Sequence, residues 1–104
     1  METNTLNKTL APVLADLIRQ HMDELKKDYH VASLAMFGSY VRGDQTPESD
    51  VDILVDFHSA IGFFKFIDLE ERLSNIIGRK VDLVSRSGIK PRIYEHIKDS
   101  LLPV

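Results

Sequence analysis

The chain has 104 residues, a formal net charge of −3 and no cysteine, and 43% of its residues are hydrophobic. This length fits one domain over residues 1–104 with one core, and the missing cysteines exclude disulfides and thiolate metal sites. The acidic balance argues against direct nucleic-acid binding, and no signal peptide or membrane-length apolar run is found, so we expect a cytoplasmic protein without membrane contact.

A helical period opens the chain. Apolar residues recur there at steps of three and four, namely at Leu10, Leu14, Leu17 and Ile18. This pattern predicts a first helix over residues 7–27. Pro12 then lies near the helix start, where a proline is tolerated best.

A short apolar run follows and ends at a glycine. Residues 31–37 read as a buried strand, and Gly38 comes directly after it. The next segment is rich in Gly, Ser and Asp, which is typical of a turn. We expect a short helix over residues 39–42 and then a loop to residue 49.

The second half of the chain repeats the change from strand to helix. Residues 51–57 alternate apolar and polar side chains, which predicts a strand with one apolar face. Residues 61–77 return to helical spacing before a strand over residues 80–85, and a last helix begins at Pro91. Its apolar positions are Ile93, Ile97 and Leu101. The predicted fold is α/β, in two layers: a small mixed sheet flanked by helices.

Two carboxylates stand at the start of the second strand. Asp50 and Asp52 are two positions apart, so a strand directs both to one face. Like charges held together resist ionisation unless a cation compensates them. Mg²⁺ prefers oxygen ligands and is often bound by one or two carboxylates plus substrate phosphates. The alternative is a pair of ordinary turn carboxylates, because the preceding Pro and Glu favour a turn.

A third carboxylate lies on the third strand. Asp82 can sit beside Asp52 if the two strands pair in the simplest register. It could then complete a site for two metal ions or take a proton from an attacking hydroxyl. The alternative is a structural role, in which Asp82 pairs with Lys80 or Arg79.

The segment after the first strand could cradle phosphate. Gly38 allows close backbone approach, and a helix that starts at Ser39 would direct N–H groups at an anion. Ser39 could instead be only a helix cap. Arg42 could contact a triphosphate or pair with Asp44 or Asp50.

These segments together resemble a known signature. Gly38-Ser39 followed by Asp50-Val51-Asp52, with Asp82 on a later strand, resembles the motif of the DNA-polymerase-β-like nucleotidyltransferase superfamily. Length and element order resemble its minimal nucleotidyltransferases. The resemblance implies the nucleotidyltransferase fold, ATP as donor and Mg²⁺, in two ions, as cofactor. By analogy Asp50, Asp52 and Asp82 are the catalytic metal ligands, and Gly38 and Ser39 bind phosphate.

The resemblance also implies a partner. Many minimal nucleotidyltransferases are antitoxins that transfer AMP to a tyrosine of a HEPN-domain ribonuclease toxin. Larger relatives hold the acceptor with an extra domain. In a minimal nucleotidyltransferase, a partner chain or a homodimer groove could take over that task. Two other functions stay open: an antitoxin that only binds its toxin, and nucleotidyl transfer to a small molecule.

The aromatic residues and histidines are interpreted as structural. Phe63, Phe64 and Phe66 have helical spacing that favours core packing, although one of them could be exposed at a partner surface. Tyr40 could pack beside a nucleotide or lie on the surface, and we assign Tyr94 to the core. The four histidines share no spacing typical of a zinc site.

Overall fold

The computed structural model describes the backbone of residues 2–104 and the side chains from Leu10 onward. Its elements in chain order are α1 (Glu2–Arg19), α2 (Met22–Tyr29), β1 (Val31–Phe37), α3 (Ser39–Arg42), β2 (Val51–Phe57), α4 (Phe63–Ile77), β3 (Val81–Ser85), α5 (Pro91–Ile97), the 3₁₀ turn η1 (Lys98–Ser100) and β4 (Leu102–Pro103). Among these described residues, no helix is both long and apolar enough to cross a membrane.

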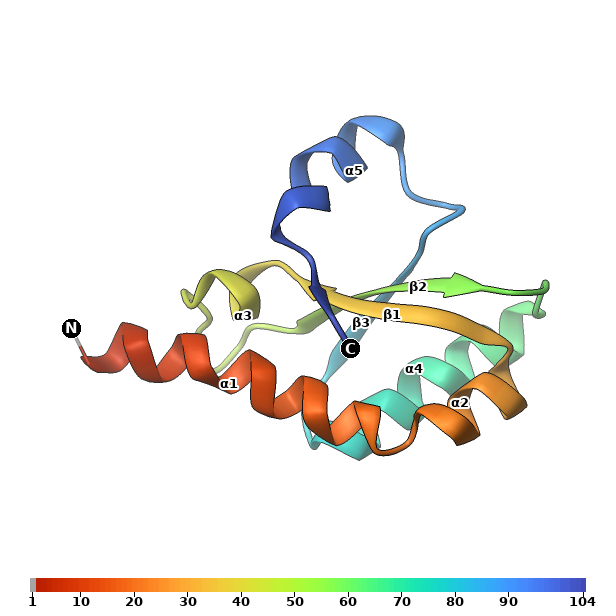
Figure 1. Ribbon diagram of the computed structural model, residues 1–104, viewed down its shortest axis with the longest axis horizontal. Helices are drawn as coiled ribbons and strands as arrows, with labels where there is room; N and C mark the ends of the chain where they lie inside the picture. Colours follow the sequence, from red (N-terminus) through yellow and green to blue (C-terminus); the bar gives the residue numbers. More distant parts are fainter. Residues whose placement is uncertain (1) are drawn as a thin grey trace.

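The four strands form one mixed sheet in the order β3-β2-β1-β4. β2 and β3 are parallel and are joined by α4, whereas β1 is antiparallel to both β2 and β4. Helices α1, α2 and α4 lie on one side of the sheet, and α5 stands over the other side (Figure 1). The predicted α/β fold with a small mixed sheet is therefore confirmed.

The core lies between the sheet and the three helices on one face. The alternating pattern of β2 produces it, because Val51, Ile53 and Val55 are fully buried there. They pack in one cluster with helical side chains that include Ile18, Leu25, Leu69 and Leu73. Asp52 lies between two of these buried positions and points to the opposite face of the sheet. The alternation that builds the core therefore places the Asp52 carboxylate outside it.

The predicted first helix over residues 7–27 is wrong in its bounds and its continuity. The helix begins at Glu2, which places Pro12 inside α1, and a turn at residues 20–21 separates α1 from α2. His21 is the second residue of this turn, and its ring Nδ1 lies 3.0 Å from the Leu17 carbonyl oxygen. Ile18 before this turn and Leu25 after it are both 0% exposed and belong to the same core cluster.

The predicted apolar face of the last helix is also wrong. α5 ends at Ile97, and Leu101 lies in extended backbone that leads into β4. β4 pairs with β1, and this pairing takes the C-terminal residues out of the helical path. No residue of α5 is buried.

Side chains of α4 accept hydrogen bonds from backbone N–H groups on the outer edge of β3. The Val81 N–H donates to Ser74 Oγ at 3.0 Å, and the Leu83 N–H donates to a Glu70 carboxylate oxygen at 2.8 Å. An unpaired strand edge is otherwise a template for association with another chain. The helix that links β2 to β3 thus also closes the edge of the sheet.

Candidate active site

The chain brings the predicted site residues together across three neighbouring strands. Asp52 on β2 is the register partner of Asp82 on β3 and of Phe37, the last residue of β1. Gly38 follows Phe37 directly. The register that places Asp82 beside Asp52 is therefore confirmed, and the glycine turn lies on the other side of Asp52.

Gly38 has a backbone conformation and a packing environment that only glycine fits. Its φ is 78° and its ψ is −152°. A Cβ built on Gly38 would lie 2.2 Å from Oδ2 of Asp52, which is too close for any side chain. The Asp52 carboxylate consequently packs directly against the backbone of the turn that starts α3.

The electrostatics of Asp52 favour a compensating cation. The pKa of Asp52 is raised to about 6, first by burial and then by the negative charges of Asp82 and Asp50. A hydrogen bond with Asp82 also raises this pKa, and the positive charge of Arg42 opposes the shift. A half-buried carboxylate beside two others is an arrangement that a divalent cation would stabilise.

Asp50 lies at the margin of this cluster. It precedes β2, and its Oδ2 is 3.8 Å from Nζ of the exposed Lys80. Within the part of the chain that the structure describes, no three acidic or histidine side chains are grouped to hold a metal ion. Asp52 and Asp82 still fit Mg²⁺, because that ion commonly takes one or two carboxylates and completes its shell with phosphate and water.

The other predicted residues have defined surroundings. Gly38, not Ser39, caps α3, so Ser39 is the first residue of the helix and does not cap it. The exposed Arg42 donates from Nε to Asp44 Oδ2 at 3.2 Å, so it forms one of the ion pairs that the sequence suggested. Tyr40 is buried and therefore does not lie on the surface, and Arg79 donates to its hydroxyl at 3.3 Å.

A cavity of about 350 Å³ opens beside the two carboxylates. Apolar residues from β1, β3 and the segment around the start of α5 line it together with the charged groups, and the complete lining is Phe37, Asp52, Asp82, Val84, Gly88, Ile89, Lys90 and Ile93. The sequence patterns did not indicate Ile89 or Lys90, and they assigned Ile93 to an apolar helix face. Only the fold brings these residues next to Asp82.

Comparisons with known proteins agree with this geometry. The model of the nucleotidyltransferase domain family matches residues 18–104, which include the glycine turn and all three aspartates. The chain belongs to this family. A relative from Thermococcus cleftensis, the protein adenylyltransferase MntA, is 44% identical over 84 residues, covering 81% of this chain and 85% of the relative. The chain is thus an enzyme of the nucleotidyltransferase class.

Solved structures share the fold. A structure named "putative minimal nucleotidyltransferase" has a TM-score of 0.72 at 26% identity and covers 94% of this nucleotidyltransferase and 95% of that chain. A chain from the complex of a tri-AMPylated Shewanella oneidensis HEPN toxin with an MNT antitoxin has a TM-score of 0.56 at 17% identity. The alignment covers 96% of the present chain and 70% of that one. At this identity the second match shows a common fold.

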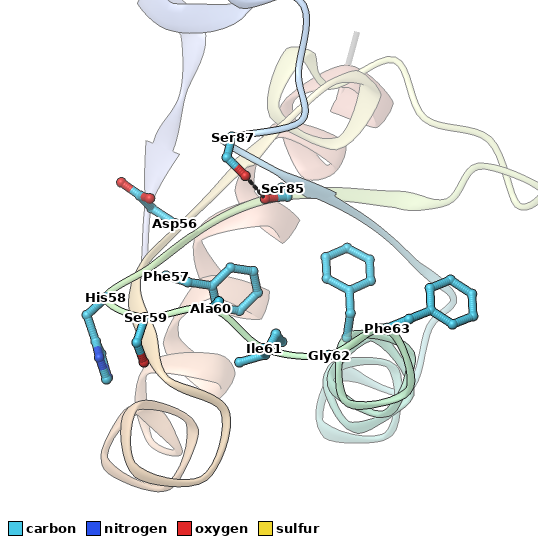
Figure 2. A pocket seen from close by; sticks show the side chains of 11 residues that line it. Asp56, Phe57, His58, Ser59, Ala60, Ile61, Gly62, Phe63, Ser85 and Ser87 are labelled. Atoms are coloured by element: carbon cyan, nitrogen blue, oxygen red, sulfur yellow. Dashed lines mark hydrogen bonds between the residues drawn. The ribbon is translucent and has the colours of Figure 1, made fainter.

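A second cavity, of about 480 Å³, lies at the other end of the nucleotidyltransferase's parallel strands. Figure 2 shows its lining, which comes from the end of β2, the loop over residues 58–62, the start of α4, and the end of β3 with the segment after it. It contains none of the predicted site residues. On its rim Phe63 is 70% exposed, and the neighbouring Phe64 is 84% exposed. The prediction of core packing allowed one exposed phenylalanine, but two of the three are exposed and only Phe66 packs against the core.

Proposed function

We propose that this nucleotidyltransferase transfers AMP from ATP to a tyrosine hydroxyl of a HEPN-domain ribonuclease toxin and thereby acts as an antitoxin. The register pair Asp52 and Asp82, beside the Gly38 turn, carries the proposal. The name of the MntA relative supports protein adenylylation, and the tri-AMPylated toxin in complex with an antitoxin of the same fold supports the choice of partner.

The proposed donor site uses the turn after β1. The backbone of Gly38 and the hydroxyl of Ser39 would contact the β- and γ-phosphates, which leave as pyrophosphate. Arg42 remains a second candidate for this contact, although in the free enzyme it is engaged with Asp44. Asp52 lies against Gly38, so this arrangement would bring the α-phosphate to the carboxylates.

The proposed reaction is a displacement at the α-phosphorus. The tyrosine oxygen forms a bond to this phosphorus, and the bond from the phosphorus to the bridging oxygen of pyrophosphate breaks. Asp82, the most exposed of the paired carboxylates, would receive the phenolic proton if it acts as the general base. The alternative role for Asp82 is that of a metal ligand.

Mg²⁺ is the expected cofactor. Asp52 and Asp82 would hold it, with Asp50 as a third ligand if its contact with Lys80 is released. A divalent ion bound there supplies positive charge that offsets the negative charge of the phosphates and the carboxylates. Whether one or two ions bind depends on the substrate oxygens that complete each shell.

The test is to incubate the enzyme with the protein encoded beside it, ATP and Mg²⁺, and to measure intact masses. We expect the partner to gain whole AMP units, and peptide mapping should place them on tyrosine. The control is the Asp50→Asn/Asp52→Asn double variant, which should add none. Replacing the partner by a panel of small hydroxylated molecules tests transfer to a small acceptor.

Two results would contradict the proposal. If the wild type and the double variant both bind the partner tightly and neither changes its mass, the protein neutralises its partner by binding alone. If AMP appears only on a small molecule, the enzyme is a nucleotidyltransferase with a different acceptor.

A further inference from the structure

The cavity beside Asp52 and Asp82 has an apolar wall that the folded chain leaves unfilled. Phe37, Val84, Ile89 and Ile93 provide it from β1, β3, the following loop and α5. Ile93 is 46% exposed although it lines this cavity, and no side chain of α5 is buried. A helix that directs an isoleucine at an open cavity beside two carboxylates would gain apolar contact from a bound ring.

The strand order decides which substrate lies on this side of the site. The Gly38 turn follows β1, Asp52 is on the central β2, and Asp82 is on β3. In nucleotidyl transfer the attacking oxygen and the leaving pyrophosphate lie roughly in line on opposite sides of the phosphorus. With pyrophosphate at the Gly38 turn, the acceptor approaches from the Asp82 side. Val84, Ile89 and Ile93, the apolar cavity residues that follow Asp82 in the chain, belong to that side, whereas Phe37 closes the cavity from β1.

We propose that Ile89 and Ile93 form the acceptor subsite, in which they contact the aromatic ring of the tyrosine that receives AMP. This inference rests on the proposed function. The ring packs between the two isoleucines and Val84, and its hydroxyl points toward Asp82. The two isoleucines therefore select a phenol over the hydroxyl of serine or threonine, which is too short to cover the apolar wall while it reaches the carboxylate.

The residues around the cavity support a neutral aromatic acceptor. Asp52 and Asp82 disfavour an anionic group that approaches without a cation, and the four apolar side chains offer no hydrogen bond to a polar one. Lys90 also lines the cavity and is exposed, so it can remain in water while the ring enters. The phenol of tyrosine combines an apolar ring with one hydroxyl, which matches both parts of the lining.

The test compares Ile93→Ser with the conservative Ile93→Leu and with the control Val13→Ser. Val13 is 54% exposed on α1 and lies outside the cavity lining. With the partner protein and Mg²⁺-ATP as substrates, KM is measured separately for the partner and for ATP. We expect Ile93→Ser to lower kcat/KM for the partner at least about tenfold. The KM for ATP and the melting temperature should stay unchanged. Ile93→Leu keeps an apolar side chain and should lose less than Ile93→Ser, and only Val13→Ser should behave like the wild type.

Each other outcome overturns the inference in a distinguishable way. Unchanged kinetics in Ile93→Ser would show that the wall does not contact the acceptor, while the proposed function stands. A higher KM for ATP with an unchanged KM for the partner would assign the wall to the nucleobase. If the wild type transfers nothing to the partner, the proposed function and this inference fail together.

Discussion

Gly38 illustrates how one residue can link the fold to the site. Its positive φ and its contact with Asp52 both exclude a side chain. We predict that Gly38→Ala destabilises the protein by more than about 1 kcal/mol and abolishes transfer, because the new Cβ displaces the Asp52 carboxylate. Thermal unfolding and the transfer assay measure the two effects.

Gly78 provides the matched control for this substitution. It also has a positive φ, of 68°, but a Cβ there would meet nothing within 4 Å. Gly78→Ala should therefore lower the free energy of unfolding by about 1 kcal/mol through backbone strain alone, and its activity should stay unchanged. Equal losses of activity in the two variants would show that Gly38 acts only through stability.

Asp52 makes the metal-free protein less stable at neutral pH. Its pKa in the fold is about 6 and its usual value is 3.8, so the folded state binds the proton more readily. The ionised Asp52 carboxylate therefore lowers the free energy of unfolding. This loss is absent below pH 4, develops between pH 4 and 6, and is complete above pH 6. The whole pKa difference corresponds to roughly 3 kcal/mol of unfolding free energy. Solvent screening at this half-buried side chain reduces the loss to about 1–2 kcal/mol.

Asp52→Asn should consequently be more stable than the wild type at pH 7.5 in the presence of a chelator, by about 1–2 kcal/mol. Urea unfolding at pH 7.5 and at pH 4 measures this difference, which should disappear at the lower pH. A variant that is less stable than the wild type at pH 7.5 would mean that the Asp52 carboxylate is stabilised by contacts other than a bound cation.

At the scale of elements, α4 both connects the parallel strands and closes the edge of β3. We predict that Glu70→Ala lowers the free energy of unfolding by about 1.5–3 kcal/mol, because the Leu83 N–H loses a charged acceptor. Glu70→Gln retains an acceptor and should lose less. Equal stability of Glu70→Ala and the wild type in urea unfolding would show that water replaces the carboxylate.

The elements that the sequence predicted well are those whose pattern matches a local rule. The alternation in β2 and the glycines after β1 and α4 identified strand ends and helix ends within a residue or two. The pairing of Asp52 with Asp82 could be predicted because both stand at the second position of their strands, and β2 and β3 pair in parallel from their first residues. Gly38 could be placed because it directly follows β1. The break at residues 20–21 could not be predicted, because the apolar period continues without interruption from Leu10 to Leu25.

Long-range pairing and the surroundings of side chains were beyond local patterns. β4 is two residues long and exists only because β1 has a free edge beside it. Helical spacing favoured the core for Phe63 and Phe64, but α4 buries Leu69, Leu73 and Ile77 instead and leaves the two phenylalanines of its first turn exposed. The role of Ile93 depends on a cavity that no sequence pattern reveals.

In the molecule as a whole, the two sides of the sheet differ in how many side chains they bury. The core lies on the side of α1, α2 and α4, whereas α5 has no buried residue (Figure 1). We predict that backbone amides of α5 exchange with solvent far faster than those of α4, because α5 can open without exposing the core. Hydrogen exchange by mass spectrometry measures this difference. Equal protection of the two helices would mean that α5 unfolds only with the whole domain.

The most direct test of the central claim is the single-turnover rate of AMP transfer by the Asp52→Asn, Asp82→Asn and Asp56→Asn variants. Asp56 lies on the same strand as Asp52 and lines the other cavity, so it controls for the loss of a β2 carboxylate. We predict that the first two variants lose at least about a hundredfold in rate and that Asp56→Asn keeps the wild-type rate. Normal transfer by either Asp52→Asn or Asp82→Asn would contradict a reaction centred on this pair.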